Sequence, residues 1–324
     1  MELRSIDSPV REQGRGDSIE AGAATQKQFQ AVLENRITPA AANPPPLSDL
    51  VRRRLVTGKS ARPLFRPESS GLESVLDADE RTRIVNTSES PWRMVCALSI
   101  DSEWGTYVGT GWFVAPTTLI TAGHCVFDRN QMNGWARRIA VTPARDRELT
   151  PFGSAVSTRF STVDRWLSDQ DPDFDIAAIH LDEPMLTDPS AVFRVGALTD
   201  EELVDYMINV SGYPGTPGGG QELYWAKNRI RAVTPRRIFY DVDTSGGQSG
   251  GPAYIFREGE IQPIVVGIHA YGLGGTPASM NMRVNSAPRI IPAVVDQIEH
   301  WCQNGGAGGI ANLGGMAGVG GGVG

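Results

Sequence analysis

The sequence predicts an all-β domain, built as a sandwich or a barrel, that ends in one helix. From residue 93 onward, short runs rich in Val, Ile, Phe, Tyr and Trp alternate with turns that contain Gly, Pro, Asp and Asn, which is typical of such domains. The expected strands cover residues 94–100, 107–115, 176–181, 207–211, 238–242 and 264–269. Over residues 290–301 the apolar side chains recur instead at helical spacing, and Pro292 falls where a first helical turn tolerates proline.

The two ends of the chain differ from this core in composition. Residues 1–73 are rich in Pro, Arg, Ser and Gln and lack sustained apolar periodicity, which predicts a flexible leader or pro-segment. In residues 305–324, 11 of 20 positions are Gly, and ordering them would cost more conformational entropy than their few apolar side chains return. We therefore expect a folded core at 74–303, followed by a disordered Gly-rich tail at 304–324.

The charge and the hydropathy of the 324-residue chain argue against two classes of partner. Its net charge is −7, and no block of Lys and Arg is interleaved with aromatic residues, so nucleic-acid binding is not expected. No apolar run approaches the roughly 20 residues that span a bilayer, so we expect no membrane partner. The 40% of hydrophobic residues is enough to build a core.

A glycine-rich turn at residues 246–252, Gly-Gly-Gln-Ser-Gly-Gly-Pro, presents Ser249 where main-chain N–H groups can converge on an anion. A serine hydroxyl is a poor nucleophile unless it has a base, a group that orients the base, and donors for the developing oxyanion. His124 follows one apolar run and can act as the base, while Asp175 precedes another and can orient it. Glycine allows the backbone geometry that would point the N–H groups of Gly247 and Ser249 at the oxyanion.

The order of these candidates along the chain, His124, Asp175 and Ser249, separates two architectures. It is the chymotrypsin order. The Gly-x-Ser-x-Gly pattern around Ser249 also fits the nucleophile elbow of α/β-hydrolases, in which the acid and the histidine follow the serine. Only His269 and His300 follow Ser249, and the alternation of strands and helices is missing, so this second architecture fits poorly.

These motifs resemble those of the trypsin-like, double-barrel serine peptidases and, among them, the glutamyl endopeptidases. The similarity extends over residues 74–303 and includes the stretches 109–114, 211–215, 243–250 and 267–269. It implies two antiparallel six-stranded β-barrels of the chymotrypsin type, with the C-terminal α-helix packed on the second barrel. It places His124 and Asp175 on the first barrel and Ser249 on the second, with a cleft between them.

The resemblance also implies the activity of a serine endopeptidase, which hydrolyses peptide bonds in protein or peptide substrates through this triad and an acyl-enzyme. We expect a monomer with no metal and no other cofactor. Asp171, Asp173 and Asp182 compete with Asp175 for the role of the acid, but only Asp175 directly precedes the strand, as in the family pattern. A pseudoprotease that uses the double barrel as a binding scaffold is a third class, although no member of the triad is lost.

The residues around the expected substrate pocket leave two specificities open. Asp243, six residues before Ser249, occupies the position where trypsins hold the carboxylate that selects Arg or Lys. Thr244 and His269 resemble the pocket of glutamyl endopeptidases, where a threonine hydroxyl and a histidine bind the substrate carboxylate. We favour cleavage after Glu, with a trypsin-type protease that cleaves after Arg or Lys as the rival.

The resemblance also bears on activation. Residues 74–83 are similar to the mature start of glutamyl endopeptidases, and self-cleavage after Glu73 would free the α-amino group of Ser74 as a third partner for the substrate carboxylate. Residues 83–85, Arg-Ile-Val, look like a trypsin activation site. In pancreatic-type trypsins, however, the new N-terminus pairs with an aspartate just before the serine, and here that residue is Gln248. Activation must therefore differ.

Three cysteines, Cys96, Cys125 and Cys302, allow at most one internal disulfide. In the resembled family a cysteine sixteen residues before the one at 125 often pairs with it, and here that position is Gly109. A hairpin between residues 93–100 and 105–115 would bring Cys96 beside Gly109. A Cys96–Cys125 disulfide and a pair of buried free thiols therefore both stay open.

The cellular location stays open as well. The resemblance implies a secreted enzyme. The first seven residues lack the apolar stretch of a secretory signal, so a cytoplasmic location is the alternative.

Overall fold

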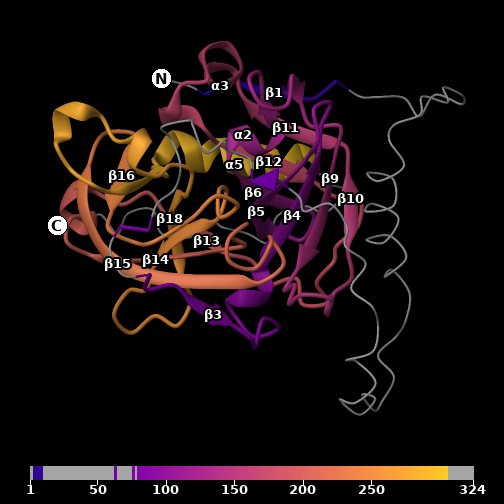
Figure 1. Ribbon diagram of the computed structural model, residues 1–324, viewed down its shortest axis with the longest axis horizontal. Helices are drawn as coiled ribbons and strands as arrows, with labels where there is room; N and C mark the ends of the chain where they lie inside the picture. Colours follow the sequence, from indigo (N-terminus) through magenta and orange to yellow (C-terminus); the bar gives the residue numbers. More distant parts are fainter. Residues whose placement is uncertain (1–2, 10–61, 64–74, 77–78, 306–324) are drawn as a thin grey trace, which may run out of the picture.

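Two curved β-sheets lie side by side in the computed structural model, which describes residues 3–9, 62–63, 75–76 and 79–305 (Figure 1). Most of the predicted leader and of the predicted tail lies outside these described residues. The description therefore concerns the predicted folded core and a few short segments before it.

The first sheet has nine strands in the order β1-β11-β12-β6-β5-β4-β9-β10, with β2 beside β5. These strands are β1 (Ser5–Asp7), β2 (Arg62–Pro63), β4 (Val95–Asp101), β5 (Thr106–Ala115), β6 (Thr118–Thr121), β9 (Arg138–Pro143), β10 (Ala155–Ser157), β11 (Arg159–Val163) and β12 (Ala177–His180). A separate small hairpin joins β7 (Phe127–Asp128) and β8 (Gly134–Trp135).

The second sheet has eight strands in the order β13-β18-β17-β14-β15-β16-β19, with β3 beside β15. These strands are β3 (Thr82–Ile84), β13 (Arg194–Val195), β14 (Met207–Gly212), β15 (Leu223–Val233), β16 (Arg237–Tyr240), β17 (Pro252–Ile255), β18 (Ile264–Ile268) and β19 (Asn285–Pro288). Bridges between Gly267 and Arg289 and between Tyr271 and Ser286 bring β19 back to β18, so this sheet closes on itself.

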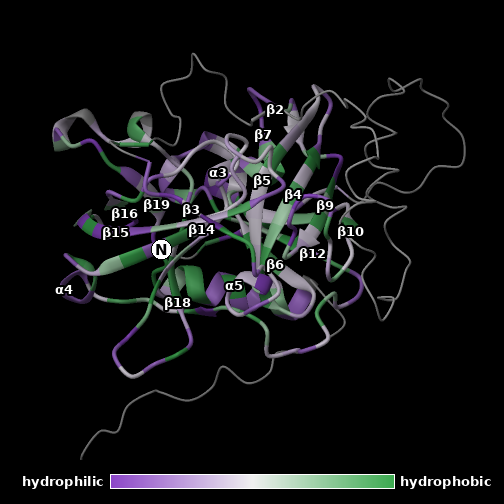
Figure 2. Ribbon diagram, turned by 60° about the horizontal axis from the view of Figure 1, so that its bottom comes forward, coloured by the Kyte–Doolittle hydropathy of each residue, from purple (hydrophilic) through white to green (hydrophobic). Residues whose placement is uncertain are grey.

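The predicted fold class is confirmed. Each of the six strand segments expected from the sequence is a strand of one of the two sheets. When the strands of three residues or fewer are set aside, each sheet keeps six strands, and these pair antiparallel throughout. Figure 2 shows hydrophobic residues along the strands of both sheets, because their side chains fill the cores that the curved sheets enclose.

The helices of the described residues are few and mostly short. They are α2 (Gly123–Val126), α3 (Asp164–Asp169), α4 (Asp200–Leu203) and α5 (Pro292–Gly305), together with the 3-10 turns η2 (Trp92–Met94), η3 (Pro172–Phe174), η4 (Leu273–Gly275) and η5 (Ala278–Met280). The predicted C-terminal helix is α5, but it packs against β6 and β12 of the first sheet rather than on the second. The reason is that its apolar residues Val294, Ile298 and Trp301 share one buried cluster with Leu119 and Ile179 of those strands.

The start of the chain differs from the predicted flexible leader. Residues 5–7 form β1, which pairs antiparallel with β11 at the edge of the first sheet. The hydroxyl of Ser5 accepts a hydrogen bond from the Trp301 indole at 2.8 Å, and the Ser161 hydroxyl donates to Asp7 at 2.5 Å. A three-residue strand has too little sequence periodicity to be predicted, because its pairing depends on the free edge of β11.

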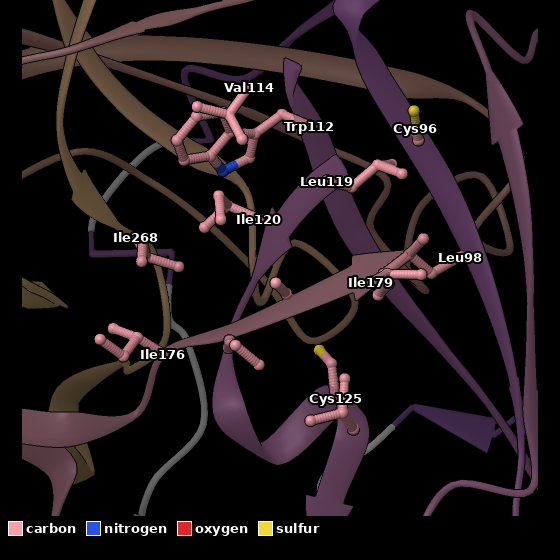
Figure 3. Close-up of a cluster of buried hydrophobic side chains, with 14 of the residues drawn as sticks. Cys96, Leu98, Trp112, Val114, Leu119, Ile120, Cys125, Ile176, Ile179 and Ile268 are labelled. Carbon is pink, nitrogen blue, oxygen red and sulfur yellow. The ribbon is translucent and has the colours of Figure 1, made fainter. Parts of the chain in front are cut away.

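The cysteines are three buried free thiols. The expected hairpin exists, but its register places Leu98 opposite Gly109, and Cys96 lies opposite Gly111. Figure 3 accordingly shows Cys96 and Cys125 well apart within the buried cluster. A Cβ atom built at Gly109 would lie 3.1 Å from the Cys125 sulfur, so position 109 rather than 96 is the neighbour of Cys125.

Candidate active site

His124 and Asp175 are joined by two hydrogen bonds. His124 lies in α2, immediately after β6, and Asp175 lies between η3 and β12, the strand that pairs with β6. The backbone N–H of His124 donates to one carboxylate oxygen of Asp175 at 2.8 Å, and the ring atom Nδ1 lies 2.7 Å from the other. The carboxylate therefore fixes both the backbone and the ring of the histidine.

Burial and the nearby negative charge shift the pKa of the His124 imidazole in opposite directions. The burial of His124 would lower its pKa, but the negative charge and the hydrogen bond of Asp175 outweigh this effect and raise the pKa well above the usual 6.5. The pair is thus arranged to stabilise an imidazolium whenever the ring takes up a proton.

The turn that carries Ser249 belongs to the second sheet but contacts the first. The carbonyl oxygen of Ser249 accepts a hydrogen bond from the Thr110 N–H of β5 at 2.8 Å and a weaker one from the Cys125 thiol at 3.7 Å. Cys125 directly follows His124 in α2. The structure therefore brings Ser249 to the junction of the two sheets, beside the helix that holds His124.

Two glycines make this close approach feasible. Gly247 has φ +103° and Gly250 has φ +86°, values that favour glycine. A Cβ atom at Gly250 would lie 2.2 Å from the Thr110 carbonyl oxygen, and one at Gly247 would lie 2.7 Å from the Tyr213 carbonyl oxygen. A larger side chain at 250 would force the turn away from the first sheet, and one at 247 would collide with the backbone that follows β14.

Two aromatic rings that the sequence motifs do not indicate lie near the imidazole of His124. The ring centroid of Trp166 in α3 is 6.4 Å from it, and that of Tyr271 is 6.3 Å from it. Tyr271 lies two residues beyond His269 at the end of β18, but nothing in the sequence near Trp166 indicates its place. The rings form part of the apolar wall around His124, which is only 2% exposed.

Asp243 uses both of its carboxylate oxygens within the chain. One accepts a hydrogen bond from the backbone N–H of Leu76 at 2.7 Å, and the other accepts from that of Glu80 at 3.0 Å. The residue is buried. Its carboxylate therefore anchors the segment that leads into β3.

Thr244 and His269, the other expected pocket residues, are fully buried. The Nδ1 atom of His269 lies 2.6 Å from the Tyr240 hydroxyl. The hydroxyl of Thr244 has no hydrogen-bond partner among the residues that the structure describes. His269 also lies beside the serine turn, because its backbone exchanges hydrogen bonds with Gly250 and Gly251 at 2.7 and 2.9 Å.

The residues expected to take part in activation are only partly described. Ser74 lies outside the described residues, but Leu76, two positions later, is the residue that donates to Asp243. Ile84 is held in β3 opposite Leu223 of β15. An N-terminus at Ile84 would therefore have to leave this strand to reach the serine turn.

In the part of the chain that the structure describes, no group of three or more His, Cys, Asp or Glu residues is placed to hold a metal ion. No helix there is long and apolar enough to cross a bilayer.

Comparison with known proteins extends these observations. A family model described as the trypsin-like peptidase domain matches residues 109–268, which include His124, Asp175 and Ser249. The glutamyl endopeptidase of Bacillus licheniformis is 32% identical over 235 residues, which are 71% of this chain and 69% of that protein. A protein of Bacillus subtilis named extracellular metalloprotease is 31% identical over 258 residues, 76% of this chain and 77% of that protein.

Among solved structures, a Glu endopeptidase in complex with MPD has a similar fold. Its TM-score is 0.59 at 23% identity, and the match covers 70% of this chain and 98% of that one. At this level of identity the likeness concerns the fold, and it is consistent with the two curved, mainly antiparallel sheets described above.

Proposed function

The chain belongs to the trypsin-like serine peptidases, and from this premise we propose that it cleaves peptide bonds after Glu through Ser249, His124 and Asp175. The single observation that carries the proposal is the pair of hydrogen bonds from His124 to Asp175, at 2.8 and 2.7 Å, beside the turn that holds Ser249. This is the arrangement that a histidine base requires.

In the proposed mechanism, the Ser249 hydroxyl attacks the carbonyl carbon of the scissile bond while His124 accepts its proton through Nε2. The other ring nitrogen faces Asp175, which fixes the tautomer and stabilises the imidazolium. The oxyanion of the tetrahedral intermediate is received by the N–H groups of Gly247 and Ser249. His124 then protonates the leaving amine, and water hydrolyses the acyl-enzyme by the same steps in reverse order.

The preference for Glu is proposed from the chemistry of the expected pocket. A substrate carboxylate that loses its water needs hydrogen-bond donors or positive charge, and each charge-assisted bond contributes about 1.5–3 kcal/mol. The buried hydroxyl of Thr244 and the imidazole of His269 are the proposed donors. The glutamyl endopeptidase name of the B. licheniformis relative supports the same preference.

The trypsin-type rival is weaker because of the environment of Asp243. Both of its carboxylate oxygens are already turned toward the backbone N–H groups of Leu76 and Glu80, so an Arg or Lys side chain would have to compete with these donors. Breaking such bonds in a buried site leaves donors without partners and costs about 1–3 kcal/mol for each. Asp243 is better described as an anchor for Leu76 and Glu80.

The same anchor supports the proposed maturation. Cleavage between Glu73 and Ser74 would leave a new N-terminus two residues before Leu76, whose N–H donates to Asp243. The Ser74 ammonium would then lie near the pocket as a third partner for the substrate carboxylate. We propose accordingly that residues 1–73 are a pro-segment, that 74–303 form the peptidase domain, and that the enzyme acts outside the cell, as the name of the B. subtilis relative says of that protein.

A serine-directed fluorophosphonate tests the proposed chemistry. The wild-type protein should be labelled and should hydrolyse peptides, and Ser249→Ala should lose both properties, with hydrolysis falling by several orders of magnitude. Chelation of metal ions should leave the wild-type rate unchanged, which separates this mechanism from that suggested by the name metalloprotease. Undiminished hydrolysis by Ser249→Ala, or loss of hydrolysis on chelation, would refute the proposal. A protein that begins at Ser74 and is still unlabelled and inactive would indicate a pseudoprotease.

A further inference from the structure

The guanidinium of Arg81 contacts the turn that precedes Ser249. Its side chain is only 4% exposed. One nitrogen, Nη1, donates to the hydroxyl of Ser245 at 2.5 Å, to the carbonyl oxygen of Thr216 at 3.2 Å and to the side-chain oxygen of Gln248 at 3.4 Å. A single buried cation thus contacts the residue immediately before the proposed nucleophile.

The opposite side of the guanidinium is fixed by a carboxylate. Nε and Nη2 of Arg81 donate to the two oxygens of Asp79 at 2.9 and 2.8 Å, a fork that sets the plane of the group. The hydrogen bond from Arg81 is the main cause of a lowered Asp79 pKa. The backbone between them is also held, because the N–H of Glu80 donates to Asp243.

The groups that Arg81 contacts define the shape of the serine turn. The Ser245 N–H donates to the side-chain oxygen of Gln248 at 3.0 Å, and the Ser245 hydroxyl donates to the Thr216 carbonyl at 2.7 Å. The neighbouring residues Gly215 and Gly246 are joined by a backbone hydrogen bond of 2.7 Å. Arg81 therefore ties together the two chain segments that enclose Gly247.

Gly247 is the residue that most needs such support. It is a glycine at φ +103°, preceded by another glycine, so no side chain restricts the peptide that carries its N–H, and the hydrogen bond from Gly215 to the Gly246 carbonyl of that peptide holds its orientation. A rotated peptide would turn this N–H away from the oxyanion. Interactions that favour one orientation before the substrate arrives increase the rate without any contact between the supporting residue and the substrate.

We propose that Arg81 is a positioning residue that holds the turn at 245–248 in the conformation that binds the oxyanion. This inference rests on the proposed function, since it assigns the oxyanion to the N–H of Gly247. Without the guanidinium, the side-chain oxygen of Gln248 and the carbonyl of Thr216 lose a buried donor, and the turn can relax. Arg81 follows closely after the proposed cleavage site at 73–74, so the new N-terminal segment of the mature enzyme would carry this positioning residue.

Steady-state kinetics of Arg81→Ala, in the full chain and on the best peptide substrate of the wild type, test this role. We expect kcat to fall by roughly 10²- to 10³-fold, the usual effect of losing one oxyanion donor, while KM changes by less than about threefold. Guanidinium ion at low millimolar concentration should restore part of kcat, because it can occupy the vacated site. Arg81→Lys should be intermediate, because an ammonium is a point charge without the planar fork, and it serves as the second variant if Arg81→Ala does not fold.

Arg83→Ala is the matched control. Arg83 lies in the same segment, but its guanidinium bonds to Asp146 and Glu222 rather than to the serine turn. The kcat of the Arg83→Ala variant should stay close to that of the wild type. The Arg81 proposal is overturned if Arg81→Ala keeps wild-type kcat, if its loss lies in KM alone, or if Arg83→Ala loses as much. A wild type that hydrolyses no peptide even after its chain has been cleaved between residues 73 and 74 would overturn the proposed function itself, which is a different result.

Discussion

At the scale of single residues, the most consequential contact is the double hydrogen bond between Asp175 and His124. One carboxylate holds the backbone and the ring together, so the imidazole cannot turn without breaking a bond in a buried site. The same carboxylate raises the pKa of the ring against the effect of burial. The orientation and the basicity of His124 thus have one cause.

This pair predicts the pH dependence of hydrolysis. The proposed mechanism needs a neutral imidazole in the free enzyme, and the pKa of His124 is raised above 6.5, so kcat/KM should increase as the pH rises through that raised pKa. Removing the charge in Asp175→Asn should move the rise to lower pH and decrease kcat by roughly 10⁴-fold. Rates measured from about pH 5 to pH 10 check both effects.

Asp173→Asn is the control for this measurement, because Asp173 lies in the same acidic loop, whereas Asp175 supplies both carboxylate oxygens that contact His124. It should leave both the midpoint and kcat nearly unchanged. If Asp175→Asn behaved like the control, the acid of the triad would have to be sought among the neighbouring aspartates.

The residues of the proposed triad could be named from the sequence because each lies in a short motif with its own local signal. The hydrogen bonds of Asp243 could not be predicted from the sequence, because its partners Leu76 and Glu80 are distant in the sequence and contact it only in the folded chain. The same is true of Arg81, whose segment the sequence marks only as the mature start. Sequence patterns thus indicate the reacting groups, and the contacts that position them appear only in three dimensions.

At the scale of elements, the hairpin of β4 and β5 accounts for the free cysteines. The two strands were predictable from their apolar runs, but a shift of two residues in the register decides whether position 96 or position 98 faces Gly109. Cys96 therefore lies opposite Gly111, out of reach of Cys125. The edge strand β1 and the packing of α5 on the first sheet were likewise beyond the sequence, because both depend on which surfaces the sheets leave uncovered.

This hairpin predicts that Gly109→Cys will form a disulfide with Cys125. A Cβ atom at 109 lies 3.1 Å from the Cys125 sulfur, within reach of an S–S bond of about 2.05 Å. Closing a loop of this length stabilises a protein by about 3 kcal/mol in the chain-entropy model, so Tm should rise by about 5–10 °C. Intact mass before and after reduction, combined with thermal unfolding, checks the bond and its effect.

Gly109→Ala, which adds the same Cβ atom without a sulfur, is the control and should not gain stability. A gain that persists after reduction would show that packing rather than a disulfide is responsible. A variant that keeps both thiols free under oxidising conditions would contradict the observed placement of Gly109 beside Cys125.

At the scale of the whole molecule, the proposed site exists because the two sheets meet at the serine turn. Thr110 of the first sheet donates to the carbonyl of Ser249. Leu76 and Arg81, which precede the first strand of the second sheet, reach Asp243 and the turn before the serine. The fold class was predictable from alternating runs and turns. The contact between the serine turn and the first sheet was not predictable, because it depends on how the two sheets pack against each other.

The central claim is a serine peptidase that cleaves after Glu, and digestion of an unbiased peptide mixture tests it most directly, with the cut bonds read by mass spectrometry. The account predicts Glu before the cut in the wild type. Hydrolysis of Glu substrates should fall by about 10- to 100-fold in His269→Ala, far more than that of neutral substrates, because one charge-assisted hydrogen bond is lost. His180→Gln, at a buried histidine whose ring contacts Ser161 of the first sheet, should keep the wild-type pattern. Cuts after Arg or Lys that vanish in Asp243→Ser and persist in His269→Ala would contradict the account.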